Sequence, residues 1–83
     1  MKLIATVYSH FSAIHVKKIL SEHNVSSKLA PVPRFLSSSC GTCVIYESDK
    51  TFPINNIPKD IEKIAKILDN NKYEILYNID SEG

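Results

Sequence analysis

The chain has 83 residues, a formal net charge of +1, and hydrophobic and charged fractions of 43% and 23%. A chain of this length folds as one domain and buries only about 60–65% of its unfolded surface. Its composition is ordinary for a soluble globular protein. Because a compact core leaves little room for a deep substrate cleft, the size favours a carrier or a binding module over a self-sufficient enzyme.

The distribution of charge and apolar residues excludes several classes of protein. The cationic residues are scattered, so no basic run predicts a nucleic-acid partner. The first residues lack the length and cleavage site of a signal peptide, and no stretch approaches the roughly 20 apolar residues of a membrane helix. Two cysteines are too few for a disulfide-stapled secreted domain. We therefore expect a cytoplasmic protein without a nucleic-acid or membrane partner.

The first part of the chain predicts a strand, a helix and a second strand. Residues 3–8 are apolar and β-branched, which is typical of a central strand. Ser9 can cap a helix from residue 10 to about residue 23, because apolar residues recur there at helical spacing. Asn24 is the expected end of this helix. Residues 28–32 predict a shorter strand, and the proline within it restricts that strand to an edge or a strand end.

The remaining elements follow an irregular loop at residues 33–42, which is rich in serine, proline and glycine. Residues 43–47 predict a third strand, and residues 48–57 a polar loop whose expected core anchors are Phe52 and Ile54. A second helix is expected from Pro58 to the Asn70-Asn71 pair, followed by a last strand at residues 73–79. The apolar stripe that predicts this helix consists of Ile61, Ile64, Ala65 and Leu68.

The order βαββαβ, with both helices apolar on one face, predicts an α+β fold of ferredoxin-like arrangement. In it, four antiparallel strands carry two helices on one face, with the first and third strands in the centre. We expect a single domain over residues 1–79 and a frayed tail over residues 80–83. Because the first two strands run parallel, the loop at residues 33–42 is expected near Ser9 and His10. The turn at residues 70–72 is expected at the same edge.

Cys40 is the main candidate for chemistry. A thiol reacts as its thiolate, whose pKa falls near cations and helix N-termini. Arg34 and the first helix could supply both, while the serine hydroxyls and loop amides could hold an anion. The alternative is that Cys40 is a small buried hydrophobic residue. The residues expected to surround it are Arg34, Ser37, Ser38, Ser39 and Gly41.

Cys40 and Cys43 have CxxC spacing, in which one thiolate attacks and the other resolves a mixed disulfide. In an extended chain their Cα atoms would be about 10 Å apart, beyond the roughly 7 Å limit for a disulfide. A bond therefore requires a tight turn, which Gly41 permits. Otherwise Cys43 is the first residue of the third strand.

The three histidines do not predict a metal site, because the spacing of His10, His15 and His23 misses the i, i+4 pairing that brings two imidazoles to one ion. His10 differs in position, since the predicted topology brings it toward the Cys40 loop. It is either a proton partner of the thiol or a solvated residue of the capping turn. No glycine-rich loop predicts phosphate binding, and no cofactor is expected.

The run Pro31-Val-Pro-Arg34 followed by Leu36-Ser-Ser-Ser-Cys40-Gly41 resembles the signature of a family of small proteins described as selenium/sulfur carrier protein-like. An opening strand, a helix with Ala13 and Leu20, and a closing helix and strand also fall in that family's order. The resemblance implies that Cys40 holds a persulfide or selenopersulfide and passes it from a donor protein to an acceptor protein. Arg34, Ser38, Ser39 and Gly41 match the signature without an assigned role, and Cys43 is not a fixed part of it.

Three functional hypotheses remain open at this point. The first is a sulfur or selenium carrier that uses Cys40, and the second is a dithiol redox protein that uses Cys40 and Cys43. The third is a non-catalytic ferredoxin-like binding module in which Cys40 is structural. Dimerisation through an edge strand also stays open.

Overall fold

The computed structural model describes residues 1–36 and 38–82. In this part of the chain, five strands form one antiparallel sheet and residues His10–Glu22 form one α-helix, α1. The strands are β1 (Lys2–Val7), β2 (Ser27–Pro31), β3 (Thr42–Glu47), β4 (Ile61–Ile67) and β5 (Tyr73–Asn78). Short 3-10 segments, η1 (Asp69–Asn71) and η2 (Ile79–Glu82), follow β4 and β5. The predicted mixed α+β class is confirmed.

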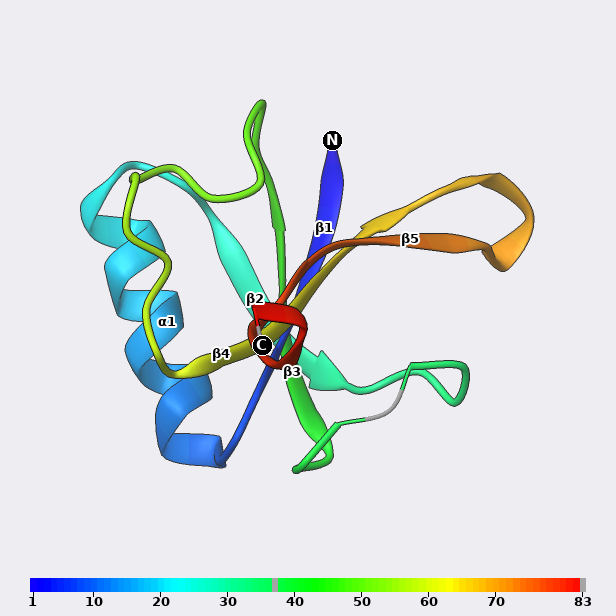
Figure 1. Ribbon diagram of the computed structural model, residues 1–83. Helices are drawn as coiled ribbons and strands as arrows, with labels where there is room; N and C mark the ends of the chain where they lie inside the picture. Colours follow the sequence, from blue (N-terminus) through cyan, green and yellow to red (C-terminus); the bar gives the residue numbers. More distant parts are fainter. Residues whose placement is uncertain (37, 83) are drawn as a thin grey trace.

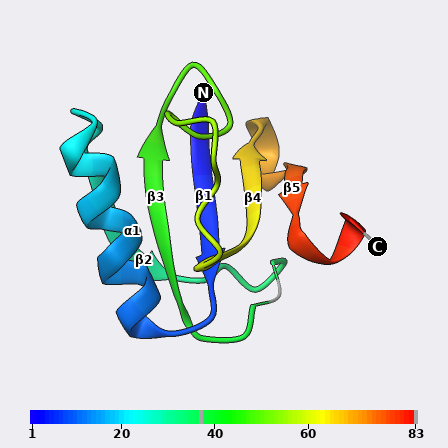
Figure 2. The same ribbon diagram turned by 60° about the vertical axis from the view of Figure 1, so that its left-hand side comes forward.

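The strands lie in the order β2-β3-β1-β4-β5, with β1 in the middle (Figure 2). As predicted, β1 and β3 lie inside the sheet and β2 lies at an edge. β1 is antiparallel to both β3 and β4, so β1, β2 and β5 share one direction. The ends of these three strands therefore meet the starts of β3 and β4 on one side of the sheet. We call this side, which is formed by strand ends and not by an outermost strand, the β1 carboxyl edge.

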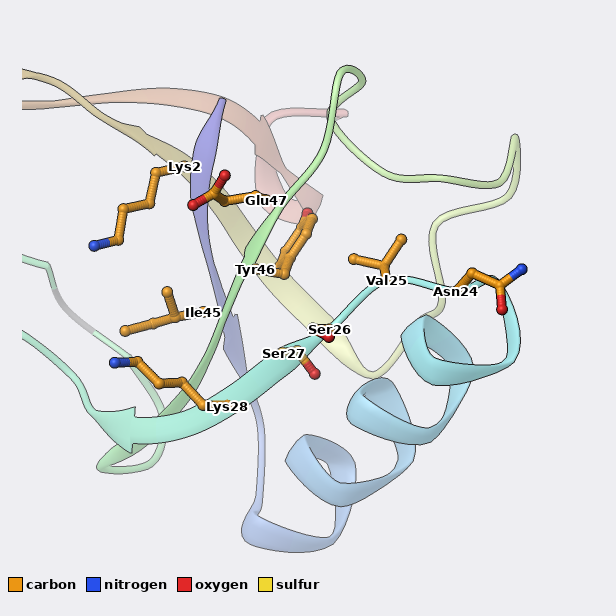
Figure 3. Close-up of a pocket in the computed structure, with 9 residues that line it drawn as sticks. All are labelled: Lys2, Asn24, Val25, Ser26, Ser27, Lys28, Ile45, Tyr46 and Glu47. Atoms are coloured by element: carbon orange, nitrogen blue, oxygen red, sulfur yellow. The ribbon is translucent and has the colours of Figure 1, made fainter.

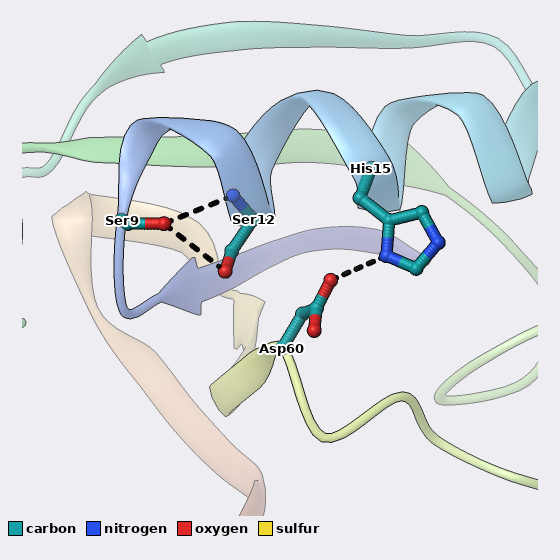
Figure 4. Close-up of polar contacts among 4 residues, drawn as sticks. All are labelled: Ser9, Ser12, His15 and Asp60. Atoms are coloured by element: carbon teal, nitrogen blue, oxygen red, sulfur yellow. Dashed lines mark hydrogen bonds and ion pairs between the residues drawn. The ribbon is translucent and has the colours of Figure 1, made fainter.

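The ends of α1 follow from local signals in the sequence. The Ser9 hydroxyl accepts a hydrogen bond from the Ser12 amide at 3.1 Å and donates one to the Ser12 hydroxyl at 3.2 Å (Figure 4). It thereby satisfies an amide that has no partner within the first helical turn. At the other end, Asn24 has a φ of 63°, and the amide of Val25 donates to the Leu20 carbonyl at 2.8 Å. This left-handed ending is a Schellman-type cap, and the predicted bounds of the helix are confirmed.

The side of the sheet that α1 covers holds the larger part of the core. The buried stripe of α1, formed by Ala13, Val16 and Leu20, packs against the apolar side chains of the central strands. Residues 48–60 complete this cover beside α1 (Figure 1). Phe52 is buried there and contacts Tyr46 edge-to-face, with 6.0 Å between the ring centroids. Phe52 and the half-buried Ile54 thus anchor the loop in the core as predicted.

The second helix was a wrong prediction, because residues Ile61–Ile67 form strand β4. Val7 pairs with Ile61, whereas Thr6 pairs with Lys63, so Glu62 is an extra residue in a β-bulge. The bulge turns Ile61 and Ile64 toward the same side of the sheet, which gives a spacing of three residues that imitates a helical stripe. The structure therefore has five strands and one helix in the described residues, instead of the predicted four strands and two helices.

The position of the turn at residues 70–72 was also predicted wrongly. β4 crosses the sheet from the β1 carboxyl edge, where Ile61 pairs with Val7, to the opposite edge, where Lys66 pairs with Leu3. With a helix at residues 58–69, the last strand would have run parallel to the third strand. Because β4 is an additional strand, β5 runs antiparallel to β3 instead. The turn between β4 and β5, in which Asn70 has a φ of 64°, therefore lies at the opposite edge from Cys40.

Candidate functional site

The loop that carries Cys40 ends at the β1 carboxyl edge. Both ribbon views place residues 38–41, drawn in green, at the same edge as the connection between β1 and α1 (Figures 1 and 2). The hydrogen bonds from this stretch to Val7, the last residue of β1, show the same proximity. The prediction that the loop and the start of the helix share an edge is therefore confirmed.

The Cys40 thiol is half-buried and faces backbone carbonyl oxygens. Its Sγ lies 3.5 Å from the Val7 carbonyl oxygen and 3.4 Å from the Thr42 carbonyl oxygen, so the S–H group can donate to either one. The side chain also packs against the core on the α1 side of the sheet. In this position the thiol is accessible only in part.

Ser38 and Ser39 fix the backbone immediately before Cys40. The Ser38 hydroxyl donates to the Val7 carbonyl at 3.4 Å and accepts from the Cys40 amide at 3.3 Å. Ser39 donates twice to Glu62, from its amide at 3.2 Å and from its hydroxyl at 2.7 Å. These hydrogen bonds tie the loop both to the end of β1 and to the start of β4.

Cys43 lies on the other side of the sheet from Cys40. It is 0% exposed and packs with Ile4, Leu36 and Ala65, away from α1. Its Sγ lies 3.7 Å from the Pro31 carbonyl oxygen. Burial, and to a smaller degree the neighbouring Cys40 thiol, raises the pKa of the Cys43 thiol above its usual value. Because a thiol reacts as its thiolate, Cys43 is an inert core residue in this conformation.

Gly41 lies in the bend formed by residues 39–41, directly before β3. Its carbonyl accepts the Val32 amide at 3.0 Å, and the next residue, Thr42, pairs with Pro31. Thr42 and Cys43 are thus held in the β2–β3 ladder, and both thiols are free. An intramolecular disulfide would require Cys43 to leave its buried position, because the two side chains pack on opposite sides of the sheet.

The first half of the loop lies over the face of the sheet opposite α1. Leu36 is buried against this face. Phe35 stacks on Tyr73 with 5.0 Å between ring centroids, and the Tyr73 hydroxyl donates to the Phe35 carbonyl at 2.8 Å. Tyr73 begins β5 at the edge opposite the β1 carboxyl edge. The exposed Arg34, which precedes Phe35, therefore belongs to the part of the loop that reaches toward that opposite edge.

His10 and Arg34, the two predicted partners of the Cys40 thiol, form no hydrogen bond or ion pair with it in the described residues. The side chain of His10 is exposed at the first position of α1, and that of Arg34 is exposed in the loop. Within the described residues, neither side chain has a hydrogen-bond or ion-pair partner. Ser37 lies outside the described residues. The predicted site residues that the structure brings together are thus Ser38, Ser39 and Cys40.

Acidic groups surround the β1 carboxyl edge near Tyr8. Partial burial raises the pKa of the Tyr8 hydroxyl, and the negative charges of Asp80 and Glu62 and the nearby Tyr77 raise it further. These residues come from the starts or ends of three different strands. Tyr8 therefore lies near negative charges at this edge, where the sequence suggested the cation of Arg34.

Glu62 is the site residue that sequence reasoning missed. Its carboxylate accepts hydrogen bonds from Ser39 and, at 3.5 Å, from the Thr6 hydroxyl. Residues 58–69 were interpreted as a helix, in which Glu62 would have been a solvated residue far from the loop. The signal available in the sequence was the β-branched character of this segment, which is also typical of a strand.

A separate groove of about 530 Å³ lies at the edge of the sheet opposite Cys40 (Figure 3). Lys2, Ile45 and Lys28 project to the same side of the sheet there, and Glu47 lies beside Lys2, with which it pairs across the strands. The groove is shallow and contains no cysteine. It is therefore not continuous with the Cys40 region.

The described residues form neither a metal-binding cluster nor a membrane-crossing helix. No group of three histidine, cysteine, aspartate or glutamate side chains is close enough there to hold a metal ion. In the same part of the chain, α1 and the short 3-10 segments fall short of the length and apolarity of a membrane-crossing helix. Elsewhere, the side chains of His15 and Asp60 contact each other and link α1 to the residues before β4 (Figure 4).

Comparison with known proteins identifies a family. The model of a family described as "Putative Se/S carrier protein-like" matches residues 2–78, which include every strand of the sheet. No curated protein and no solved structure matches the chain.

Proposed function

The chain belongs to the Se/S carrier protein-like family, and on that premise we propose that Cys40 carries a sulfur or selenium atom between two proteins. The observation that supports this role is the contrast between the two thiols. Cys40 is half-buried in a loop at the edge of the sheet, whereas Cys43 is fully buried in the core. Of the two sulfur atoms, only that of Cys40 can meet a partner protein without unfolding of the sheet.

The proposed transfer needs no external oxidant or reductant. The Cys40 thiolate attacks the outer sulfur of a persulfide on a donor protein, and the proton of the thiol passes to solvent. The new bond joins Cys40 Sγ to that sulfur, the sulfur–sulfur bond of the donor breaks, and the donor cysteine leaves as a thiolate. A nucleophile on the acceptor protein then attacks the carried atom and releases Cys40 as a thiolate. A selenopersulfide follows the same sequence with selenium as the carried atom.

The structure of the loop supports a carrier more than an enzyme with its own substrate cleft. The carried atom would extend from Cys40 at an open edge of the sheet, where a protein can approach it. The free thiols fit a reducing compartment such as the cytoplasm. A second copy of the chain would find unpaired backbone groups along the edge strands β2 and β5.

A structural role for Cys40 is the second candidate. It is favoured by the packing of the Cys40 side chain against the core and by its S–H group, which can donate to the carbonyl oxygen of Val7 or of Thr42. In that case the chain would be a binding module and its thiol would have no carrier function. The dithiol hypothesis is weaker, because Cys40 and Cys43 contact opposite sides of the sheet.

Incubation with a cysteine desulfurase and cysteine, followed by intact mass measurement, tests the proposal. A carrier gains the mass of one sulfur atom, and a thiol reductant removes it. Cys43→Ala gains the same mass, whereas Cys40→Ser does not. If the wild-type chain gains nothing while a known sulfur acceptor in the same reaction is labelled, the structural role replaces the carrier role.

A further inference from the structure

We propose that Glu62 is a latch that holds the Cys40 thiol in its sheltered position, and that opening of this latch controls how fast the thiol reacts. The inference rests on the proposed function, because it describes how the carrying thiol is protected when no partner is bound. The latch consists of the Glu62 carboxylate and the two donors of Ser39, the residue directly before Cys40.

The β-bulge of β4 places Glu62 where it can reach the loop. Glu62 is the extra residue between the pairs Val7–Ile61 and Thr6–Lys63. A bulge leaves its additional residue outside the regular ladder and re-aims its side chain. Here the carboxylate turns to the β1 carboxyl edge, where Thr6 and Ser39 donate to it. The bulge thus has a local consequence for the loop that carries Cys40.

The contact between Glu62 and Ser39 uses both carboxylate oxygens. Oε1 accepts the Ser39 amide at 3.2 Å and Oε2 accepts the Ser39 hydroxyl at 2.7 Å. Hydrogen bonds to an ionised acceptor are stronger than neutral ones, and two parallel bonds fix orientation as well as distance. Ser39 itself is exposed, so the contact can open without disruption of the core.

The conformation that the latch holds protects the thiol. Ser38 and Cys40 both donate to the Val7 carbonyl, and Cys40 also faces the Thr42 carbonyl. A thiolate in this position would face carbonyl oxygens, which cannot donate a hydrogen bond to it. The negatively charged carboxylate of Glu62 also lies nearby, because it contacts Ser39, the residue before Cys40. Release of Ser39 would let the Cys40 sulfur move away from these oxygens and into solvent. Opening therefore increases the exposure of the sulfur.

The rate of alkylation of Cys40 by iodoacetamide tests the latch without any sulfur donor. Site-resolved mass spectrometry measures the rate at Cys40 and, in the same sample, at Cys43, which reports opening of the core. The variants are Glu62→Ala, Glu62→Gln and Ser39→Ala. Glu47→Ala removes an exposed carboxylate at the opposite edge of the sheet and serves as the matched control.

We expect Glu62→Ala to accelerate alkylation of Cys40 by about fivefold or more, since hydrogen bonds to a charged group are lost. Ser39→Ala should also accelerate alkylation of Cys40, but to a smaller extent, because the hydrogen bond from the backbone amide of residue 39 to Glu62 remains. Glu62→Gln, which keeps one acceptor oxygen, should fall between wild type and Glu62→Ala. The rate at Cys43 and the behaviour of Glu47→Ala should not change.

Three outcomes would overturn the latch. The first is an unchanged or slower rate at Cys40 in both Glu62→Ala and Ser39→Ala. The second is a parallel acceleration at Cys43, which would assign the effect to general unfolding. The third is an equal acceleration in Glu62→Gln and Glu62→Ala, which would assign it to charge alone. A failure of sulfur loading in the wild-type chain would count against the carrier role and would leave these alkylation rates unaffected, so the two failures can be distinguished.

Discussion

Cys40 Sγ lies 3.5 Å from the carbonyl oxygen of Val7, so the thiol of the loop is joined to the end of the central strand. Val7 is fully buried and pairs with Ile61 across the sheet. The sulfur is therefore held beside the buried central strand, although the loop itself is long and irregular. A thiol held in this way is available at one defined place and is still partly covered.

We expect Cys43 to contribute to stability and not to the proposed carrier function. We expect Cys43→Ala to lower the unfolding free energy by about 1 kcal/mol, because a buried group the size of a methylene is removed and a small cavity remains. Urea denaturation measures this loss. Sulfur loading of the variant should equal that of wild type, and mild oxidation of the wild-type chain should leave both thiols countable. A quantitative intramolecular disulfide would contradict the placement of Cys40 and Cys43 on opposite sides of the sheet.

The stability of the fold should fall at alkaline pH because of Cys43. Burial, and then the neighbouring Cys40, raises the pKa of this thiol above its usual value of 9.0. The unfolded chain thus releases the proton at a lower pH than the folded chain does. The stabilisation is fully present below the unfolded pKa and is lost as the pH rises through the folded pKa.

Urea denaturation of wild type and Cys43→Ala at several alkaline pH values measures this effect. The unfolding free energy of wild type should decline more steeply, by up to about 1.4 kcal/mol per pH unit. Tyrosine and lysine residues titrate in both proteins, so the comparison isolates Cys43. Parallel pH profiles would contradict the burial of its thiol.

The hydrogen bond from Tyr73 to Phe35 stabilises the first half of the loop. Tyr73→Phe keeps the ring stack but removes the hydroxyl donor, and we expect a loss of about 0.5–1 kcal/mol of unfolding free energy. Tyr73→Ala removes both contacts and should also speed amide hydrogen exchange over residues 32–36. Tyr77→Phe is the control, because the structure gives its hydroxyl no hydrogen bond within the described residues. Equal losses in the two phenylalanine variants would contradict the anchoring role of Tyr73.

The Ser9 cap positions the start of α1 beside the Cys40 loop. Ser9→Ala leaves the Ser12 amide without its acceptor, and we expect a loss of about 1 kcal/mol. Thermal or urea unfolding followed by circular dichroism measures it. Ser26→Ala, at an exposed position outside the helix, provides the comparison. An effect of Ser9→Ala no larger than that of Ser26→Ala would show that the cap does not stabilise the helix.

The features that could be predicted from the sequence are those with local signals. The serine before α1 and the asparagine after it mark its ends through their own side chains and backbone preferences. The position of β2 at an edge follows from its proline. The proximity of the Cys40 loop to the start of α1 followed from the parallel direction of β1 and β2, and it did not depend on the second helix.

The features that could not be predicted depend on pairing between distant residues. The bulge at Glu62 exists only because β4 pairs with β1, and it makes a strand imitate helical spacing. The contact of Glu62 with Ser39 joins residues 23 positions apart and has no local signal. The contrast between Cys40 and Cys43 likewise arises from the tertiary structure, since Cys43 lies in β3 and faces away from α1, whereas Cys40 lies in the bend before β3 and packs on the α1 side.

Site-resolved mapping of the carried atom is the most direct test of the central claim. The wild-type chain is incubated with a protein persulfide donor, the persulfides are trapped by alkylation, and the peptides are analysed by mass spectrometry. The carrier role requires an additional sulfur on Cys40, none on Cys43, and its transfer to an acceptor thiol at a rate that Cys43→Ala does not change. The absence of a persulfide on Cys40, or equal transfer by Cys40→Ser, would contradict it.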